Sequence, residues 1–241
     1  MRLDSLPTIL SIDTATDVCS VALLRAGRIE ERSETVGHRH SERVLPMALA
    51  LLADAGLDLA ACDALAFGAG PGAFTGLRIA CGVVQGLAYG AGKPAIPVGN
   101  LEALALAVLR QYPQAECVLC ANDARMREAY VAVYRRSDGA AVERLAPALV
   151  GARDLGDLIE HWAPDVVAGD APTTFAQELA SAAASRRLVS MRATAASVAD
   201  CAAYKWSAGQ AVEPARAAPL YVRDHVALTI EERRRRQGSP A

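Results

Sequence analysis

The sequence repeats one order of strands and helices twice, and this repeat limits the folds that the chain can adopt. In each half, three strand-like segments are followed by a helix, a strand, a helix, a strand and a helix. The first copy runs from the apolar stretch 8–13 to a helix at 101–111, and the second runs from a strand at 116–121 to a helix at 195–208. Period-two patterning indicates the strands, and apolar residues three or four apart indicate the helices. We therefore expect an α/β protein made of two βββαβαβα units.

The composition excludes several classes of protein. Hydrophobic residues make up 52% and charged residues 22% of 241, and the net charge of -2 gives no overall attraction to nucleic acid. No apolar run reaches the length needed to cross a membrane. The six cysteines lie mostly in apolar runs, as reduced core thiols do. Cys117 and Cys120, the one close pair, would point to opposite faces of a strand, which disfavours a zinc site. We expect a cytoplasmic protein without membrane contact.

The repeated unit resembles the duplicated, ribonuclease H-like fold of actin, sugar kinases and acetate kinase, known as the ASKHA superfamily. The resemblance implies a first subdomain at 1–107 and a second at 108–225. The basic cluster Arg233–Arg236 could contact nucleic-acid phosphates non-specifically, but its place in a Gln-Gly-Ser-Pro tail favours a disordered end at 226–241. The resemblance also implies an ATP site between the halves, formed by a hairpin turn in each half and a Gly-Gly loop in the second. A fold does not establish a function, so each loop is considered separately.

All three nucleotide loops depart from the pattern of the fold. In the first turn, Ala15 replaces the glycine that would let the backbone approach a phosphate. The second turn has no glycine and carries Ala124 and Arg125, and the third loop places Asp170 where a carboxylate would repel phosphate. We expect no bound cofactor and weak ATP binding or none. The residues interpreted as vestiges of the nucleotide loops are Asp13, Thr14, Asp123 and Gly169.

Several longer motifs identify a narrower resemblance. The runs "GAGPGAFTGLRIACGVVQGLAYG", "NDARMREAYVAVY" and "PLYVRDHVA" are similar to the bacterial TsaB family, also called YeaZ, over residues 8 to about 226. This resemblance implies a part in making threonylcarbamoyladenosine (t6A) next to the anticodon of tRNA. In that system TsaD resembles the catalyst, TsaE is a P-loop ATPase, and TsaB is a non-catalytic companion. The resemblance therefore implies a heterodimer with TsaD, contact with TsaE, and tRNA contact only through the complex.

The residues that bind metal in TsaD are replaced in this chain. TsaD paralogues carry histidines in a run like Pro-Val-His-His-Met-Glu-Gly-His, and the corresponding stretch here is Pro97-Val98-Gly99-Asn100-Leu101-Glu102-Ala103-Leu104. Since glycine and leucine cannot bind iron or zinc, we expect neither a metal site nor a catalytic residue. We expect Asn100 to cap the helix that follows. The alternative is an active enzyme of this fold, either an ATP-dependent kinase or a metallopeptidase of the glycoprotease type.

A second histidine-containing stretch, His38-Arg39-His40, does not have metallopeptidase spacing. Two zinc ligands on one helix face would be four residues apart, whereas these histidines are two apart. We expect a solvated loop here, with Ser41 as the cap of a helix over 41–55.

The glycines of the 74–90 helix recur at four-residue spacing, which places them on one face. That face could pack on the protein's own sheet or form a subunit interface together with helix 41–55. The second interpretation predicts a homodimer when the chain is alone. The loop Gly70–Ala73 would set the angle of the 74–90 helix without binding a phosphate tightly. The candidate interface residues are Leu45, Leu49, Leu52, Gly82, Gly86 and Gly90.

Overall fold

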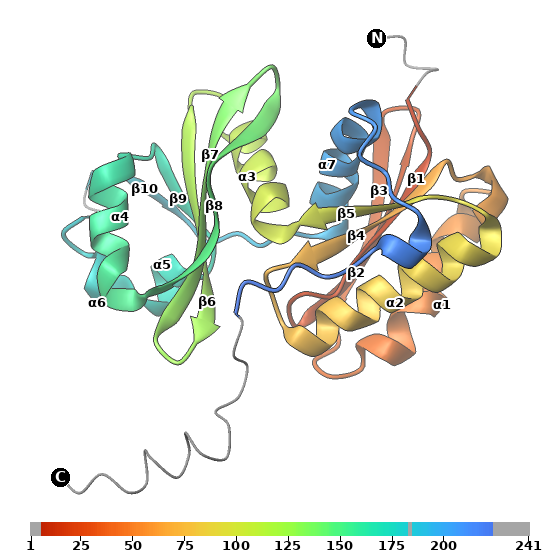
Figure 1. Ribbon diagram of the computed structural model, residues 1–241, viewed down its shortest axis with the longest axis horizontal. Helices are drawn as coiled ribbons and strands as arrows, with labels where there is room; N and C mark the ends of the chain where they lie inside the picture. Colours follow the sequence, from red (N-terminus) through yellow and green to blue (C-terminus); the bar gives the residue numbers. More distant parts are fainter. Residues whose placement is uncertain (1–5, 183–184, 224–241) are drawn as a thin grey trace, which may run out of the picture.

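A computed structural model describes residues 6–182 and 185–223, and it contains two five-stranded mixed sheets of the same topology. This confirms the expected duplicated α/β fold (Figure 1). The first sheet has the order β3 (Arg28–Thr35), β2 (Val18–Arg25), β1 (Ile9–Asp13), β4 (Ala64–Gly70) and β5 (Ala95–Gly99). The second sheet has the order β10 (Arg187–Val189), β9 (Val166–Ala168), β6 (Cys117–Arg125), β7 (Glu128–Ser137) and β8 (Ala140–Gly151). The expected tail at 226–241, with Arg233–Arg236, lies outside the described residues.

The helices and sheets form five layers. On the outer face of the first sheet lie α1 (His40–Asp54) and α2 (Phe74–Ala91). Between the sheets lie α3 (Asn100–Gln111) and α7 (Ala195–Ser207). On the outer face of the second sheet lie α4 (Leu155–Trp162), α5 (Ala171–Thr174) and α6 (Ala176–Leu179). Short 3-10 turns occur at Leu59–Ala61, Ala152–Asp154 and Pro214–Arg216. None of the helices that the structure describes could cross a membrane.

The sequence pattern of each strand follows from what covers its two faces. On β1, Leu10 and Ile12 pack towards α1 and α2, whereas Ile9 packs towards the layer between the sheets. Because both faces of the sheet are covered, all five residues of β1 are buried, including the polar Ser11 and Asp13. At the sheet edge, β3 alternates half-buried and exposed residues, as its charged sequence predicts. The hairpin turns at Ala26–Gly27 and Asp138–Gly139 have positive φ at both residues, which matches the right-handed twist of the strands.

The last helix of each copy lies between the two sheets. α3 packs against the strands of the second sheet, α7 packs against all five strands of the first sheet, and the two helices touch. Residues from both copies therefore share one buried core. Ser11 in β1 donates a hydrogen bond of 2.7 Å to the carbonyl of Ala195, 184 positions later in the chain. Each half thus packs its last helix against the sheet of the other half, and this exchange of helices holds the two halves together. The expected boundary between residues 107 and 108 stays a prediction.

Two local expectations were wrong. The first helix begins at His40 with Arg39 at its N-cap and no side-chain cap, so Ser41 lies inside the helix. The sequence also predicts one helix over 173–186, but the structure has two short helices, α5 and α6, which are separated at Phe175 with φ of -116°. The two threonines in α5 are weak helix formers, which explains the early break.

All six cysteines are buried and free. Cys117 packs in the core under α4, and Cys120 packs in the core between the sheets, so their side chains point to opposite faces as expected. Burial raises the pKa of both thiols, which keeps them protonated and unreactive.

Candidate functional site

The first hairpin turn, after β1, forms a buried junction at the carboxyl ends of three parallel strands. Asp13 is 1% exposed, and its Oδ1 accepts a hydrogen bond of 2.8 Å from the amide of Ala15. Its Oδ2 accepts a hydrogen bond of 2.5 Å from Nδ2 of Asn100, at the start of α3. Oδ1 of Asn100 in turn accepts a hydrogen bond of 2.7 Å from the amide of Gly70. The carboxylate is therefore fully engaged by groups of the chain itself.

Burial raises the pKa of the Asp13 carboxyl from its usual value of 3.8 to about 6. The hydrogen bonds from Ala15 and Asn100 favour the charged form and oppose part of this rise, whereas the nearby Glu31 adds to it. The group consequently titrates just below neutral pH.

The Gly-Pro loop and the start of α2 are packed directly on this turn. The amide of Ala73 donates a hydrogen bond of 2.8 Å to the carbonyl of Ala15, and the Thr14 hydroxyl donates one of 2.7 Å to the carbonyl of Gly76. A Cβ added at Gly76 would overlap the carbonyl oxygen of Thr14. Glycine is required here because two backbones meet, with no space left for a phosphate between them.

The second hairpin turn is also joined to its neighbours by internal hydrogen bonds. The amide of Asp123 donates a hydrogen bond of 2.7 Å to Oδ1 of Asp170, so Asp170 occupies a backbone donor of that turn. Oδ1 of Asp123 accepts a hydrogen bond of 2.8 Å from the amide of Arg125. A Cβ added at Gly169 would overlap the carbonyl oxygen of Ala121, so these two strand ends approach closely. The four residues interpreted as vestiges of nucleotide loops all lie in such packed turns.

One arginine joins the two halves beside these turns. The guanidinium of Arg192, in the segment before α7, pairs with Asp17 in the first half. It also lies 3.9 Å from a carboxylate oxygen of Asp170 in the second half. No local sequence pattern marks Arg192, because its partners lie 175 and 22 positions away.

The stretch that corresponds to the TsaD metal site is used for internal contacts. The carboxylate of Glu102 lies 3.2 Å from the ammonium of Lys205 on α7. The expectation that Asn100 caps α3 was wrong, because the N-cap is Gly99 and the Asn100 side chain bonds to Asp13 and Gly70. Among the described residues, no group of three or more histidine, cysteine or acidic side chains could hold a metal ion.

The solvated-loop expectation for the two histidines at the entry of α1 was half right. His38 is exposed, but His40 is the first residue of α1 and is only 6% exposed. Burial lowers the pKa of His40, so it is neutral at pH 7.

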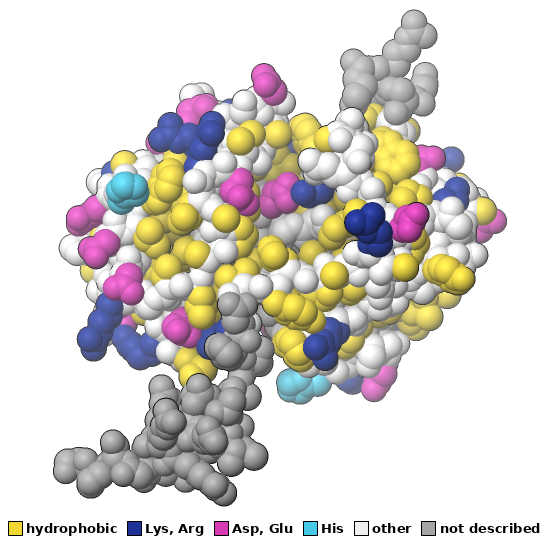
Figure 2. Space-filling view, viewed as in Figure 1, with side chains coloured by type: hydrophobic (Ala, Val, Ile, Leu, Met, Phe, Trp, Pro, Cys, Tyr) yellow, Lys and Arg dark blue, Asp and Glu magenta, His cyan; other side chains and the backbone are white. Residues whose placement is uncertain are grey.

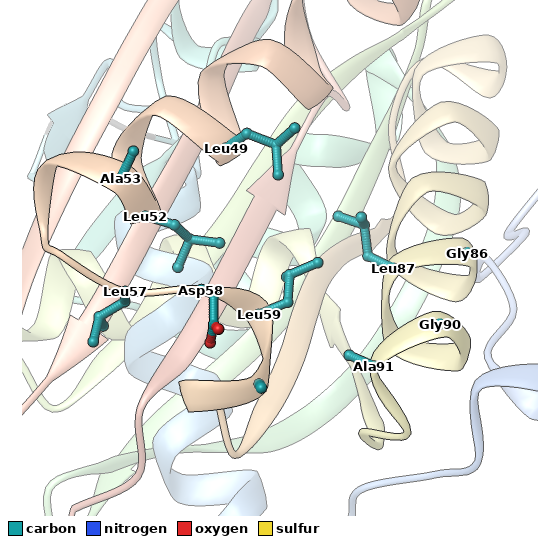
Figure 3. Close-up of a pocket in the computed structure, with 11 residues that line it drawn as sticks. Leu49, Leu52, Ala53, Leu57, Asp58, Leu59, Gly86, Leu87, Gly90 and Ala91 are labelled. Atoms are coloured by element: carbon teal, nitrogen blue, oxygen red, sulfur yellow. The ribbon is translucent and has the colours of Figure 1, made fainter.

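The exposed sides of α1 and α2 form an apolar surface with a groove between the helices. Side chains from both helices and from the turn that follows α1 point into a cavity of about 530 Å³ (Figure 3). Leu49 is 47% exposed at its rim, and Leu52 is buried at its floor. Few charged side chains lie along α2 in the space-filling view (Figure 2). We call this region the α1–α2 surface, and we define it by Leu45, Leu49, Gly82, Gly86, Leu87 and Gly90.

The three spaced glycines of α2 lie on the open side of this surface. Within the described residues, no atom beyond the adjacent residues and the local backbone of α2 lies within 4 Å of a Cβ built at Gly82, Gly86 or Gly90, and all three are exposed. The interpretation that this face packs on the protein's own sheet is therefore wrong. Of the six candidate interface residues, Leu49, Leu52, Gly86 and Gly90 line the groove, with Leu52 also in the core. Leu45 on α1 and Gly82 on α2 are exposed outside the groove lining.

A segment near the end of the described chain, 217–223, crosses the front of the molecule from α2 to the second hairpin turn (Figure 1). The amide of Leu220 donates a hydrogen bond of 2.7 Å to the carbonyl of Ala69. The Tyr221 hydroxyl accepts a hydrogen bond of 3.0 Å from Arg78. Arg223 donates to the carbonyl of Ala124 and pairs with Glu128 at 2.7 Å. The motif "PLYVRDHVA" marked this segment in the sequence, but not what it contacts.

Comparison with known proteins gives consistent matches. Residues 32–206 match the family described as "TsaD: tRNA N6-adenosine threonylcarbamoyltransferase". The tRNA threonylcarbamoyladenosine biosynthesis protein TsaB of Haemophilus influenzae is 50% identical over 51% of this chain and 52% of its own length. The chain thus spans about half the length of that curated relative.

Solved structures resemble a larger part of the chain. A Pseudomonas aeruginosa protein described as similar to the peptidase YeaZ is 37% identical, with a TM-score of 0.82 over 90% of this chain and all of its own. A putative N-acetylmannosamine kinase from Listeria monocytogenes is 12% identical with a TM-score of 0.51 over 84% of this chain and 99% of its own, which shows a shared fold only.

Proposed function

Because the chain belongs to the TsaB family, also called YeaZ, we propose that it is an accessory subunit in the formation of threonylcarbamoyladenosine in tRNA. The observation that carries this proposal is the 50% identity to a relative named for that pathway. Modification of tRNA would take place in the cytoplasm, which fits a chain with six reduced, buried thiols.

The subunit is proposed to be non-catalytic. Transfer of a carbamoyl group to an adenosine amine requires a group that polarises the carbonyl and orients the donor. In this chain Gly99 and Leu104 replace metal-binding side chains, Glu102 is paired with Lys205, and Asn100 is engaged by Asp13. No observation favours the alternative of an active kinase or metallopeptidase.

The proposed partners are a TsaD-type paralogue and a TsaE-type ATPase, with tRNA contacted through the complex. The α1–α2 surface is the proposed site of the paralogue, because it combines exposed leucines with glycines that let another helix approach closely. In the absence of the paralogue, a second copy of this chain would occupy the same surface and form a homodimer. A small displacement of reacting groups can cost orders of magnitude in rate, so a docked subunit can be essential without touching the substrate.

Reconstitution tests the proposal directly. Unmodified tRNA and threonylcarbamoyl-adenylate are combined with this chain, the paralogue, the ATPase and ATP, and one protein is omitted at a time. We expect no t6A from this chain alone and little when it is omitted. Product formed by the chain alone would overturn the non-catalytic assignment, and full turnover without the chain would overturn the accessory role.

A matched pair of variants links the activity to the surface. Gly86→Leu places a bulky side chain on the α1–α2 surface and should reduce t6A formation in the complete mixture. Glu160→Leu adds the same side chain at an exposed position of α4 and should leave the rate unchanged.

A further inference from the structure

Three buried polar groups form a continuous hydrogen-bonded path at the carboxyl ends of the parallel strands of the first sheet. Asp13 at the end of β1 accepts from Asn100 at the start of α3, and Asn100 accepts from Gly70 at the end of β4. Asp13 and Asn100 are 1% and 3% exposed. Because an ionised carboxylate only accepts hydrogen bonds, it fixes which end of the Asn100 amide faces it. The carbonyl end must then face the Gly70 amide.

The path leads to the segment from which α2 starts. Gly70 is followed by Pro71 and Gly72, and α2 begins at Phe74. The same hairpin turn that contains Asp13 contacts this segment twice more, through the carbonyl of Ala15 and the hydroxyl of Thr14. Three independent hydrogen-bonded links thus connect the turn to the loop and the first turn of α2.

Burying the Asn100 side chain costs free energy unless both ends of its amide are hydrogen-bonded. Its presence here therefore indicates a role in positioning the groups that it joins. A buried polar group must be fully paired to avoid destabilising the fold, and two apolar side chains would fill the space without this requirement. Little room remains for rearrangement, because a Cβ added at Gly68 would overlap the Asp13 carboxylate. The Asn100 side chain is not needed as a cap, and its neighbour Glu102 bonds elsewhere.

We propose that Asn100 is a positioning residue that holds the Gly70–Ala73 loop against the Asp13–Thr16 turn and thereby sets the position of α2 in the α1–α2 surface. The local part of this inference rests on the hydrogen bonds alone. Its consequence for partner binding rests on the proposed function of the α1–α2 surface.

A reversal of the path tests the inference in the full-length protein. Asn100→Leu removes the hydrogen bonds of the Asn100 side chain to Asp13 and to Gly70. Asp13→Asn leaves two amide side chains facing each other, and no orientation of the two amides makes all three hydrogen bonds at once. The double variant Asp13→Asn/Asn100→Asp reverses the direction, since an amide at position 13 can donate to a carboxylate at position 100. The other oxygen of that carboxylate still accepts from Gly70, and the carbonyl at position 13 still accepts from Ala15. All three hydrogen bonds survive only in the wild type and the double variant.

Hydrogen exchange followed residue by residue is the measurement. In each single variant, the Gly70 amide and the first turn of α2 should exchange roughly tenfold faster than in the wild type. The double variant should return these amides to within about threefold of the wild type. Amides of the second sheet, such as Val118 and Val167, serve as the internal control and should be unchanged.

Three results would overturn the local inference. These are an unchanged Gly70 amide in Asn100→Leu, equal loss of protection in both sheets, or failure of the double variant to recover. Self-association is measured in parallel, and the single variants should weaken it at least threefold. If the single variants change hydrogen exchange but leave self-association unchanged, Asn100 does not set the position of α2 in the α1–α2 surface, and that part of the inference is overturned. If Gly86→Leu also leaves association unchanged, the proposed surface fails, whereas the local inference is still decided by exchange alone.

Discussion

At the scale of residues, the two halves share hydrogen bonds as well as strand order. Oδ1 of Asp13 accepts from the amide two residues later, and Oδ1 of Asp123 does the same in the second copy. Each turn is then joined to a neighbouring strand end, by Asn100 in the first half and by Asp170 in the second. The duplicated turn has therefore kept its local geometry, while different side chains supply the link to the neighbouring strand.

The buried Asp13 predicts an unusual pH dependence of stability. Its pKa is 3.8 in the unfolded chain and about 6 in the fold, so the folded state binds more protons between these values. Its contribution to the free energy of unfolding is therefore largest in acid and is lost as the pH rises through 6. We expect a loss of about 2 kcal/mol between pH 4.5 and 7.5 relative to Asp13→Asn, whose side chain cannot ionise.

Urea unfolding of both proteins across this pH range measures the effect. Asp157→Asn, at an exposed position of α4, is the control and should show the same pH dependence as the wild type. Glu31 and Cys19 also interact electrostatically with Asp13 and are present in all three proteins. A difference between wild type and Asp13→Asn that does not vary with pH would contradict the prediction.

At the scale of elements, α2 contains two kinds of glycine. Gly76 faces the first hairpin turn, where a Cβ would overlap Thr14, whereas Gly86 faces open space. Gly76→Ala should lower the free energy of unfolding by about 2 kcal/mol or more, because two backbones must separate. Gly86→Ala should raise it by about 0.5–1 kcal/mol, because alanine favours the helix.

Urea unfolding at concentrations low enough to keep the protein monomeric compares the two alanine variants. Equal effects at the two positions would show that contact with the turn does not distinguish them. Destabilisation by Gly86→Ala under these conditions would show that its face is packed within the monomer.

The elements were predictable from the sequence to the extent that local patterning decides them. Strand order and the main helices follow from apolar periodicity, and the exposed edge strand follows from its charges. The role of Asn100 and the ion pairs of Arg192 did not follow, because their partners are distant in sequence. Asn100 is predicted to be a helix cap because asparagine is common at that position. In the structure its side-chain amide instead donates to the buried carboxylate of Asp13, 87 residues earlier. Tertiary contacts outweighed local preference at these positions.

At the scale of the whole molecule, the exchange of the last helices predicts that the first half cannot fold alone. α7 covers one face of the first sheet, where Ile9, Ala66 and Val98 are buried. A fragment of residues 1–111 would leave these side chains facing water. We expect it to unfold without a cooperative transition and to bind a hydrophobic dye.

Adding a fragment of residues 112–223 should restore a single cooperative transition. Circular dichroism and dye fluorescence measure both states. A cooperatively folded 1–111 fragment would show instead that α7 is dispensable for the first sheet.

The α1–α2 surface predicts the assembly state of the isolated protein. A two-fold dimer needs a surface that can pair with itself, and an apolar groove between two helices meets this requirement. In sedimentation experiments we expect a dimer for the wild type and for Glu160→Leu, and a folded monomer for Gly86→Leu. A folded Gly86→Leu dimer would place the contact on another surface.

The position of α7 also has a consequence for synthesis on the ribosome. The hydrogen bond from Ser11 in β1 to Ala195 requires a residue that is made 184 positions later. At a synthesis rate of about 5–20 residues per second, roughly ten to forty seconds pass between synthesis of β1 and synthesis of the start of α7. During this interval the inner face of the first sheet is available to chaperones. The order of translation therefore delays completion of the half that is synthesised first.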